Sequence, residues 1–391
     1  MIYLDYNATT PLCAPAREAM LPYLERHFGN ASSIHAAGRE ARAAIDDARD
    51  QLAGLIGAKP HELIFTGSGT EANNLAVLGL ARANAERGRH LICASTEHHA
   101  VLHPFEHLQR SEQFDVSFLR VDSGGRIDPD ELAREIRPDT TLVSIMTANN
   151  ETGVVQPMRE ISEVCRARGV LLHSDMIQCF GKLPTNLRGG LVDAASFAAH
   201  KFYGPKGAGF LYLRAGLPIQ PILFGGAHEN DRRPGTENVA ALAGMAAAAE
   251  WALSDLDAEQ TRQASLRDQL WTAIADACPS ARQNGDPAHR LANTLNVSFS
   301  GVSSETMLMA LDLEGIGVSS GSACMVGSVV ASHVLLAMGC DQEVARSAIR
   351  FSLGKQTTPA EITAAADAIR RVLGRLSPSA ELVDGRSYAA V

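Results

Sequence analysis

The chain has 391 residues and a formal net charge of −9, from 35 lysines and arginines against 44 aspartates and glutamates. This length allows one large domain and a smaller one, and the acidic balance without a basic stripe argues against a nucleic-acid-binding surface. No run of about 18 apolar residues predicts a membrane span, and the seven cysteines show neither a C-x-x-C pair nor the spacing of metal ligands. Because no leader-like segment opens the sequence, we expect a cytoplasmic protein with reduced thiols and no metal.

The first two thirds of the chain alternate strand-like and helical segments. Apolar runs typical of β-strands lie at residues 62–66, 90–94, 116–121, 141–146, 170–174, 194–197 and 209–213. Helical patterns lie between them, as at residues 71–87 and 158–168. Strands that alternate with helices predict an α/β protein whose parallel or mixed sheet is covered by helices on both faces.

After the predicted strands two helices follow, and a new pattern begins near Arg290. We expect helices at 240–253 and 257–277, a strand at 294–299, a helix at 304–314, a short strand at 349–352 and a closing helix at 359–376. Thr358 and Pro359 suit the N-cap and first turn of this last helix. This α+β portion predicts a second, smaller domain.

Lys201 stands in a stretch of small apolar residues, SFAAHKFYGPKGAGF (196–210). Burying an ammonium is costly unless it is paired or neutralised, so Lys201 could belong to a structural ion pair or be a nucleophile that forms a Schiff base. Upstream, an apolar strand ends at Asp175, where a parallel strand would open into a ligand crevice. Asp175 could cap a helix or pair with a pyridinium nitrogen. Together the two residues match the layout of a pyridoxal phosphate enzyme of the aspartate aminotransferase fold.

Two further segments follow predicted strands. In TGSGTEANN (66–74), Gly69 and Thr70 could hold an anion at the positive end of a helix, although a glycine-rich turn is often only a tight turn. In STEHHAVL (95–102), His98 and His99 could stack on a cofactor or transfer protons near neutral pH. They could equally be surface or hydrogen-bonded core residues, and metal binding is a third alternative.

Nine motifs then occur in a fixed order: LDYNATTP (4–11), FGNASSIH (28–35), FTGSGTEANNLA (65–76), EHHAVL (97–102), ANNETGVVQP (148–157), HSDMIQ (173–178), AHKFYGPKG (199–207), RPGTENVA (233–240) and SSGSAC (319–324). Through them the chain resembles the NifS/IscS-type, class I cysteine desulfurases over residues 1–375. The resemblance implies the fold type I of pyridoxal phosphate-dependent transferases, with a mostly parallel seven-stranded sheet between helices in a large domain at 15–255. Residues 1–14 and 256–391 would form the smaller α+β domain, which carries the active-site cysteine loop.

The resemblance also implies how pyridoxal 5'-phosphate would be held. Lys201 would bind the cofactor covalently, Asp175 would contact its pyridine nitrogen and Gln178 its phenolic oxygen. His98 would stack on the ring and could transfer protons during the reaction.

Other matching positions would bind the charged ends of cofactor and substrate. Thr70, His200 and Thr236 would hold the phosphate, with Thr236 contributed by the other subunit of a homodimer. Asn150 and Arg350 would anchor the carboxylate of L-cysteine, for which the fork of an arginine is suited.

Cys324 decides between this family and other enzymes of the fold. It lies in SSGSACMVGS, where small residues predict a mobile loop, although it could also be an ordinary free cysteine. The resemblance implies that its thiolate takes sulfur from L-cysteine, leaving L-alanine and a persulfide. An acceptor protein, such as an iron–sulfur scaffold, would then receive the sulfur.

The sequence departs from the family's usual pattern at a few positions. Met176 replaces a small residue after Asp175 and could either face the cofactor or simply pack in the core. Ala198 replaces a serine that contacts the phosphate in several relatives. Asn230 and Pro234 replace an arginine and a serine, and the residues after Cys324 are more apolar than usual: Met325, Val326, Val329 and Val330.

Two other functions stay open at this point. One keeps the cofactor but changes the chemistry, as in a selenocysteine lyase or another β-eliminating C–S lyase. The other, from a different class, is a catalytically idle homologue that binds a partner. The presence of Lys201, Asp175, His98 and Cys324 counts against the idle homologue.

Overall fold

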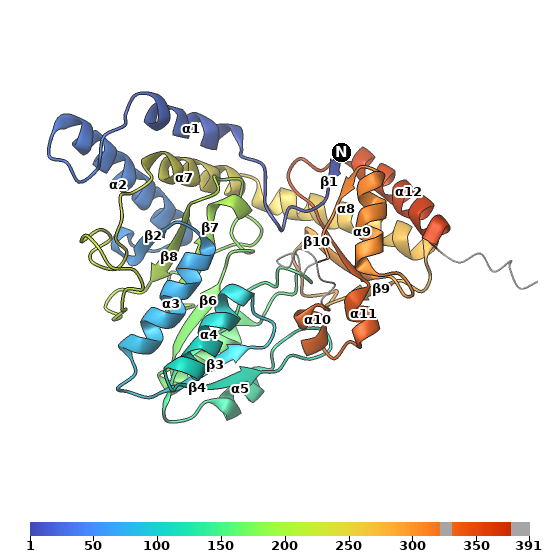
Figure 1. The fold of residues 1–391 in the computed structure, drawn as a ribbon, viewed down its shortest axis with the longest axis horizontal. Helices are drawn as coiled ribbons and strands as arrows, with labels where there is room; N and C mark the ends of the chain where they lie inside the picture. Colours follow the sequence, from blue (N-terminus) through green and yellow to red (C-terminus); the bar gives the residue numbers. More distant parts are fainter. Residues whose placement is uncertain (321–330, 377–391) are drawn as a thin grey trace, which may run out of the picture.

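A seven-stranded sheet forms the centre of the larger part of the molecule (Figure 1). The computed structural model describes residues 1–320 and 331–376. Across the sheet the strands are β2 (Leu63–Thr66), β8 (Gly209–Leu213), β7 (Ala194–Ala198), β6 (Leu171–Asp175), β5 (Thr140–Ser144), β3 (His90–Ala94) and β4 (Asp115–Leu119). β8 runs antiparallel to both neighbours, and every other neighbouring pair is parallel. The expected mostly parallel, seven-stranded sheet is confirmed.

Helices cover both faces of this sheet and explain its apolar strands. One face packs against α3 (Gly69–Ala83) and α4 (His99–Ser111), and the other against α2 (Ala36–Ile56), α6 (Met158–Arg168) and α7 (Val239–Leu253). Successive side chains of a strand point to opposite faces. In β3, Leu91 and Cys93 therefore join the first cluster, whereas Ile92 and Ala94 join the second. The strands inside the sheet are buried on both faces and therefore read as largely apolar runs, whereas the edge strand β4 keeps Asp115 exposed.

Two more helices flank this α/β unit. α1 (Ala14–Glu25) packs along α7, and α5 (Pro129–Glu135) packs beside α6 and β4. Short 3-10 turns precede β2 and follow β7, namely η1 (Pro60–Glu62) and η2 (Ala199–Lys201). The second turn carries Lys201 directly beyond the end of β7.

The smaller part has its own sheet and its own apolar core. Antiparallel β9 (Arg282–Asn284), β10 (Thr294–Ser298) and β12 (Ala348–Ser352) form the sheet, with β10 in the middle. The core is completed by α8 (Leu256–Ala277), α9 (Ser304–Leu313) and α12 (Pro359–Leu376). Two short helices, α10 (His333–Ala337) and α11 (Gln342–Arg346), lie at its edge. The expected α+β character of this region is confirmed.

The N-terminal residues connect the two parts. β1 (Ile2–Tyr3) pairs in parallel with β11 (Ile316–Gly317), and Leu4 belongs to the smaller core. The chain then passes through Asn7 and Ala8 before α1 reaches the larger part (Figure 1). The division into 15–255, 1–14 and 256–391 stays a prediction.

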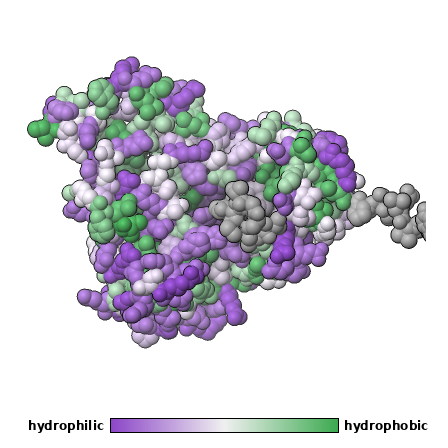
Figure 2. Space-filling model, in the orientation of Figure 1, coloured by the Kyte–Doolittle hydropathy of each residue, from purple (hydrophilic) through white to green (hydrophobic). Residues whose placement is uncertain are grey.

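The view in Figure 2 shows a mostly hydrophilic surface, with apolar patches at the end of the molecule formed by α1 and α2. Within residues 1–320 and 331–376, no single helix is long and apolar enough to cross a membrane. The bent pair α7 and α8, which meet at 71°, passes that test of length and composition only when taken together.

Candidate active site

A cavity of about 350 Å³ opens at the carboxyl ends of β6 and β7, beside the start of α3. This is the edge at which open α/β sheets bind ligands. Nine residues expected from the sequence line it: Gly69, Thr70, His98, Asn150, Asp175, Gln178, His200, Lys201 and Arg350. They come from segments far apart in the chain and include Arg350 from β12 of the smaller part.

Among the residues that the structure describes, one expected residue does not line this cavity. Thr236 lies elsewhere, and its neighbour Glu237 lines a second hollow. Cys324 and the apolar residues that follow it (325, 326, 329 and 330) lie outside the described residues.

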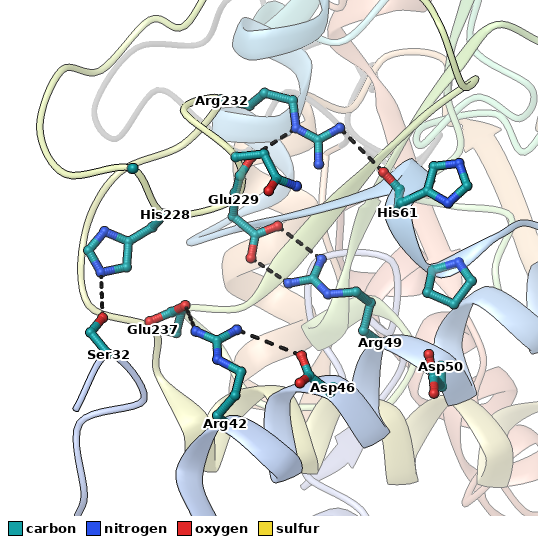
Figure 3. Close-up of a pocket in the computed structure, with 13 residues that line it drawn as sticks. Ser32, Arg42, Asp46, Arg49, Asp50, His61, His228, Glu229, Arg232 and Glu237 are labelled. Atoms are coloured by element: carbon teal, nitrogen blue, oxygen red, sulfur yellow. Dashed lines mark hydrogen bonds and ion pairs between the residues drawn. The ribbon is translucent and has the colours of Figure 1, made fainter. Parts of the chain in front are cut away.

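The second hollow, of about 610 Å³, is more open (Figure 3). In it Arg49 pairs with Glu229 and Arg42 with Glu237, at 2.6 Å in each case. Arg42 and Arg49 are thus engaged by carboxylates of the chain itself, whereas Arg232 donates to the backbone carbonyls of Glu229 and His61. None of the residues expected to hold a cofactor lies in this hollow. We therefore assign the chemistry to the smaller cavity, although the second hollow has the larger volume.

Lys201 is held by backbone carbonyl groups of the N-terminal segment. Its Nζ donates to Asn7 O at 2.7 Å and to Ala8 O at 2.8 Å. The 3-10 turn η2 presents it from the end of β7, beside the end of β6. This arrangement points an amine into the cavity beside residues 7 and 8 of the N-terminal segment.

Asp175 is the last residue of β6 and is 4% exposed. It accepts hydrogen bonds from Asn73 Nδ2 at 2.7 Å and from the Ile177 backbone N–H at 2.9 Å. Burial raises the pKa of Asp175, while these hydrogen bonds and Lys201 act in the opposite direction. No α-helix starts at this point of the described chain, so Asp175 is not a helix cap.

Asn73 was not expected from the sequence. It lies within the first turns of α3, on the side that faces β6, and its Oδ1 is buried without a partner among the described residues. Its position one turn after Gly69, in a helix that starts at the cavity, is the signal that could have identified it.

His98 caps the N-terminus of α4, because its Nδ1 accepts from the Ala100 backbone N–H at 3.0 Å. Burial, with the nearby charge of Lys201, lowers the pKa of His98 to about 4. The imidazole is therefore neutral at pH 7. His99 takes a different direction and stacks between His103 and His333, with ring centroids 4.8 and 4.6 Å away.

Metal binding was one alternative for these histidines. In the part of the chain that the structure describes, no group of three or more His, Cys, Asp or Glu side chains could hold a metal ion. The pair thus divides into one imidazole that lines the cavity and one that packs against other rings.

The start of α3 offers an anion site. Ser68 is the N-cap, and Gly69 and Thr70 are the first two helical residues, so their backbone N–H groups have no partner within the helix. A side chain at position 69 would place its Cβ 2.3 Å from Ile177 Cδ1, so any larger residue there would have to displace Ile177. Glu71, in the same turn, is engaged by Arg233 at 2.7 Å and does not neutralise this end.

His200 lies beside this site. Its Nδ1 is 3.1 Å from Thr9 Oγ1, and burial together with Lys201 lowers the pKa of His200 to about 4. Ala198 also lines the cavity, and its methyl group carries no hydroxyl for an anion.

Met176 is 3% exposed, belongs to the core and does not line the cavity, so it packs in the core and does not face a ligand.

Arg350 occupies the opposite side of the cavity and is 3% exposed. It donates to Asp5 Oδ1 at 2.7 Å and to Asn150 O at 2.9 Å. Its Nε is buried without a partner among the described residues. An anion that reached this guanidinium would share it with Asp5.

Asn7 and Lys182 are further residues that sequence reasoning missed. Lys182 Nζ donates to Asn7 Oδ1 at 2.9 Å and to Gln178 Oε1 at 2.6 Å. Asn7 stands inside the motif LDYNATTP, and Lys182 follows Gln178 by four residues in an otherwise apolar segment. A lysine among apolar residues, the same observation that singled out Lys201, is the signal that could have identified Lys182.

This fold is that of the class-V aminotransferases. The family model described as "Aminotransferase class-V" matches residues 2–364, and the chain belongs to that family. Within it, the chain belongs with the cysteine desulfurases of the IscS/NifS type. It is 45% identical to cysteine desulfurase IscS of Dictyoglomus turgidum, over 96% of this chain and 95% of that protein.

Solved structures agree with this assignment. A NifS-like protein superimposes with a TM-score of 0.90 at 36% identity, covering 96% of this chain and 99% of that one. A structure described as SspA in complex with cysteine gives a TM-score of 0.80 at 34% identity, over 90% of this chain and 99% of that chain.

Proposed function

We propose that the protein is a pyridoxal 5'-phosphate-dependent cysteine desulfurase that converts L-cysteine to L-alanine and leaves a persulfide on Cys324. The observation that carries the proposal is the convergence of Lys201, Asp175 and the N-terminus of α3 on one cavity. The cysteine complex of a relative supports the choice of substrate.

The residues present fit pyridoxal phosphate. Asp175 offers a buried carboxylate that a protonated ring nitrogen would satisfy, and a cation there would offset the desolvation that raises its pKa. Gly69 and Thr70 offer backbone N–H groups to a phosphate, with His200 beside them. Lys201 offers the amine that would bind the cofactor, His98 a neutral ring that could stack on it, and Gln178 an amide for its phenolic oxygen.

When bound, the cofactor supplies an electron-withdrawing ring that stabilises negative charge on the substrate. The chain's own groups would do the rest. Arg350 and Asn150 would orient the substrate carboxylate, and the Lys201 amine would move the proton of the substrate's α-carbon. His98, neutral at pH 7, could accept a proton from the substrate thiol.

Sulfur transfer would then proceed by nucleophilic attack. The Cys324 thiolate forms a bond to the substrate sulfur while the carbon–sulfur bond breaks, and that electron pair stays on the carbon side. Proton uptake there gives L-alanine. The persulfide on Cys324 would be passed to an acceptor protein, such as an iron–sulfur scaffold.

Two other features belong to this proposal. We infer a homodimer in which Thr236 completes the phosphate site of the other subunit. We also place the protein in the cytoplasm, supported by six described cysteines that form no disulfide: Cys13, Cys93, Cys165, Cys179, Cys278 and Cys340.

The test combines visible absorbance with intact mass. Purified protein incubated with L-cysteine should show a cofactor band and gain the mass of one sulfur atom, which dithiothreitol removes. Cys324→Ser should keep the band and lose the mass gain, whereas Cys340→Ser, at a partly buried cysteine elsewhere in the chain, should retain both. A band with sulfide release that does not depend on Cys324 would indicate a β-eliminating lyase, and the absence of a band would indicate an idle homologue.

A further inference from the structure

The proposed function gives no role to Lys182, whose amine contacts two residues that line the cavity. It lies in the turn after β6, and its Nζ donates to Gln178 Oε1 at 2.6 Å and to Asn7 Oδ1 at 2.9 Å. Both of these partners are neutral amides, and no carboxylate forms a salt bridge with Lys182 in residues 1–320 and 331–376. Burying a lysine amine without a carboxylate partner costs free energy, so this position calls for a functional explanation.

Three titratable groups face this amine from three elements: Lys201 from η2, Cys179 from the turn after β6, and Arg350 from β12. The residue is partly exposed, but burial of the amine lowers the pKa of Lys182 to about 7, with Lys201 and Arg350 acting in the same direction and Cys179 against it. At neutral pH a substantial fraction of Lys182 is therefore an ammonium.

An ammonium decides which way the neighbouring amide points. It carries three donors and no acceptor, so only the carbonyl oxygen of Gln178 can face it. The amide nitrogen must then lie on the other side, and there Gln178 Nε2 donates to Asn7 O at 3.0 Å. The reverse orientation would place the amide oxygen against Asn7 O and an N–H against the ammonium, which leaves both contacts repulsive.

The orientation of this amide matters because Gln178 lines the cavity. An amide nitrogen has two N–H groups, and the bond to Asn7 O uses one of them. The second can donate to an oxygen bound in the cavity. With the amide reversed, the cavity would instead meet a carbonyl oxygen, which repels an anionic oxygen.

We propose that Lys182 is a positioning residue: held between Gln178 Oε1 and Asn7 Oδ1, it fixes the side-chain amide of Gln178 so that an N–H group faces the cavity. The inference rests on the proposed function, because the oxygen that receives this hydrogen bond would belong to the bound cofactor. Lys182 touches neither cofactor nor substrate in this account. It acts through Gln178 alone.

A double-mutant cycle on the cofactor-loaded protein tests this. The readout is the pH midpoint at which the visible band of bound pyridoxal phosphate titrates. A donor to an anionic oxygen, and a cation nearby, both favour the less protonated form, so Lys182→Met should move the midpoint upward by roughly one pH unit. In a Gln178→Leu background most of that shift should vanish, because residues that act through each other are not additive.

Two control variants separate positioning from charge and folding. Lys182→Arg keeps a cation that only donates and should titrate close to the wild type. Lys59→Met removes an exposed lysine elsewhere and should change nothing. The proposal is overturned if Lys182→Met shifts the midpoint equally with and without Gln178, which would mean a direct effect of charge, or if Lys182→Arg shifts it as far as Lys182→Met does.

The same link can be measured without cofactor. The chain has five lysines, so competitive acetylation across a pH series followed by peptide mass spectrometry resolves each of them: Lys59, Lys182, Lys201, Lys206 and Lys355. Gln178→Leu removes an acceptor from the ammonium of Lys182 and should move its labelling midpoint to lower pH. An unchanged midpoint would overturn the proposal. A wild-type protein that binds no cofactor would refute the proposed function separately.

Discussion

Arg350 reaches the cavity with its guanidinium already engaged. Asp5 and the carbonyl of Asn150 each accept one hydrogen bond from it, at 2.7 and 2.9 Å, and Asp5 balances its charge in a site that is nearly closed to water. A buried charge that loses its partner is strongly destabilising. The same partner, however, competes with any carboxylate ligand. Stability and ligand affinity are thus opposed at this one residue.

Asp5→Asn should separate these two effects. The asparagine side chain would keep an oxygen for Arg350 but remove the compensating charge, so we expect the free energy of unfolding to fall by about 1–3 kcal/mol. The freed guanidinium should bind a carboxylate such as that of L-alanine more tightly. Denaturant titration measures the first effect and calorimetry the second.

Asp367→Asn is a matched control, since Asp367 also pairs with an arginine but on the surface, where the two side chains are 52% and 55% exposed. Surface pairs contribute little, so this variant should change the free energy by less than about 1 kcal/mol. If Asp5→Asn alters neither stability nor carboxylate binding, the ion pair neither stabilises the buried Arg350 nor competes with its ligands.

At the scale of elements, strand ends and helix starts place the chemistry. β6 ends at Asp175, β7 runs into η2 and Lys201, and α3 starts at Gly69. The start of α3 comes so near the turn after β6 that a Cβ at Gly69 would lie 2.3 Å from Ile177 Cδ1 and 3.1 Å from Ala198 Cβ.

Gly69→Ala should therefore push α3 away from the cavity. Overpacking of this kind costs about 1–3 kcal/mol, and we expect weaker cofactor binding in equilibrium dialysis along with lower stability. Ile177→Val shortens the side chain that the new methyl would meet and should restore part of both. Gly54→Ala, in α2 with nothing within 4 Å of the added Cβ, should instead stabilise the protein slightly. Full cofactor affinity in Gly69→Ala would contradict this account.

A buried histidine in the central strands makes the stability of the protein depend on pH. His173 of β6 bridges Ser144 of β5 and Ser196 of β7, at 2.8 and 3.0 Å, and burial lowers the pKa of His173 to about 3. Between that value and the ordinary histidine pKa of about 6.5, the unfolded chain binds a proton that the folded chain does not. The free energy of unfolding must therefore fall as pH drops through this window.

Replacing His173 with asparagine should flatten that dependence. A histidine of this kind makes the free energy of unfolding fall by about 1.4 kcal/mol for each pH unit. Between pH 6 and 4 the slope of the variant should therefore be smaller by about 1.4 kcal/mol per pH unit. At pH 7 the variant should be less stable than the wild type. Denaturant titrations at several pH values measure the slope. His61→Asn, at an exposed histidine, should leave it unchanged. An equal slope in His173→Asn would show that other groups control acid unfolding.

At the scale of the whole molecule, periodicity and motifs in the sequence predict much of the secondary structure and of the cavity. They do not predict the contacts between distant segments. Apolar runs located all seven strands of the large sheet, because the strands buried on both faces contain few polar residues and the partly exposed β4 still contains Val116, Phe118 and Leu119. They also located α12 at 359–376. Short or mostly polar elements, such as β9 and α11, gave no periodic signal.

The cavity was anticipated through residues whose chemistry is unusual in an apolar context, such as Lys201 and Asp175. Asn7, Asn73 and Lys182 were missed because their roles depend on hydrogen bonds between segments more than 100 residues apart in sequence. A single sequence does not encode such pairs as a local pattern.

Asn7 shows how the two parts of the molecule depend on one side chain. Its Oδ1 accepts from Lys182 of the larger part at 2.9 Å and from Asn293 of the smaller part at 3.0 Å. Its Nδ2 donates to Thr294 Oγ1 at 2.9 Å, and its backbone carbonyl accepts from Lys201 and Gln178. The residue is 1% exposed, so water cannot replace these partners.

Asn7→Ala should thus weaken the attachment of one part to the other. The substitution leaves one N–H group of Lys182 and one of Asn293 without an acceptor, although each nitrogen keeps a second partner. Each unsatisfied buried group costs about 1–3 kcal/mol. We expect a fall in the free energy of unfolding and faster amide exchange in β1 and β10, because the N-terminal segment is no longer held at Asn7. Hydrogen exchange with mass spectrometry resolves these segments. Asn30→Ala is the control and should exchange like the wild type, because the Asn30 Oδ1 accepts from the exposed Ser32 backbone N–H. If exchange increases only next to residue 7, the side chain serves the cavity alone and does not join the two parts.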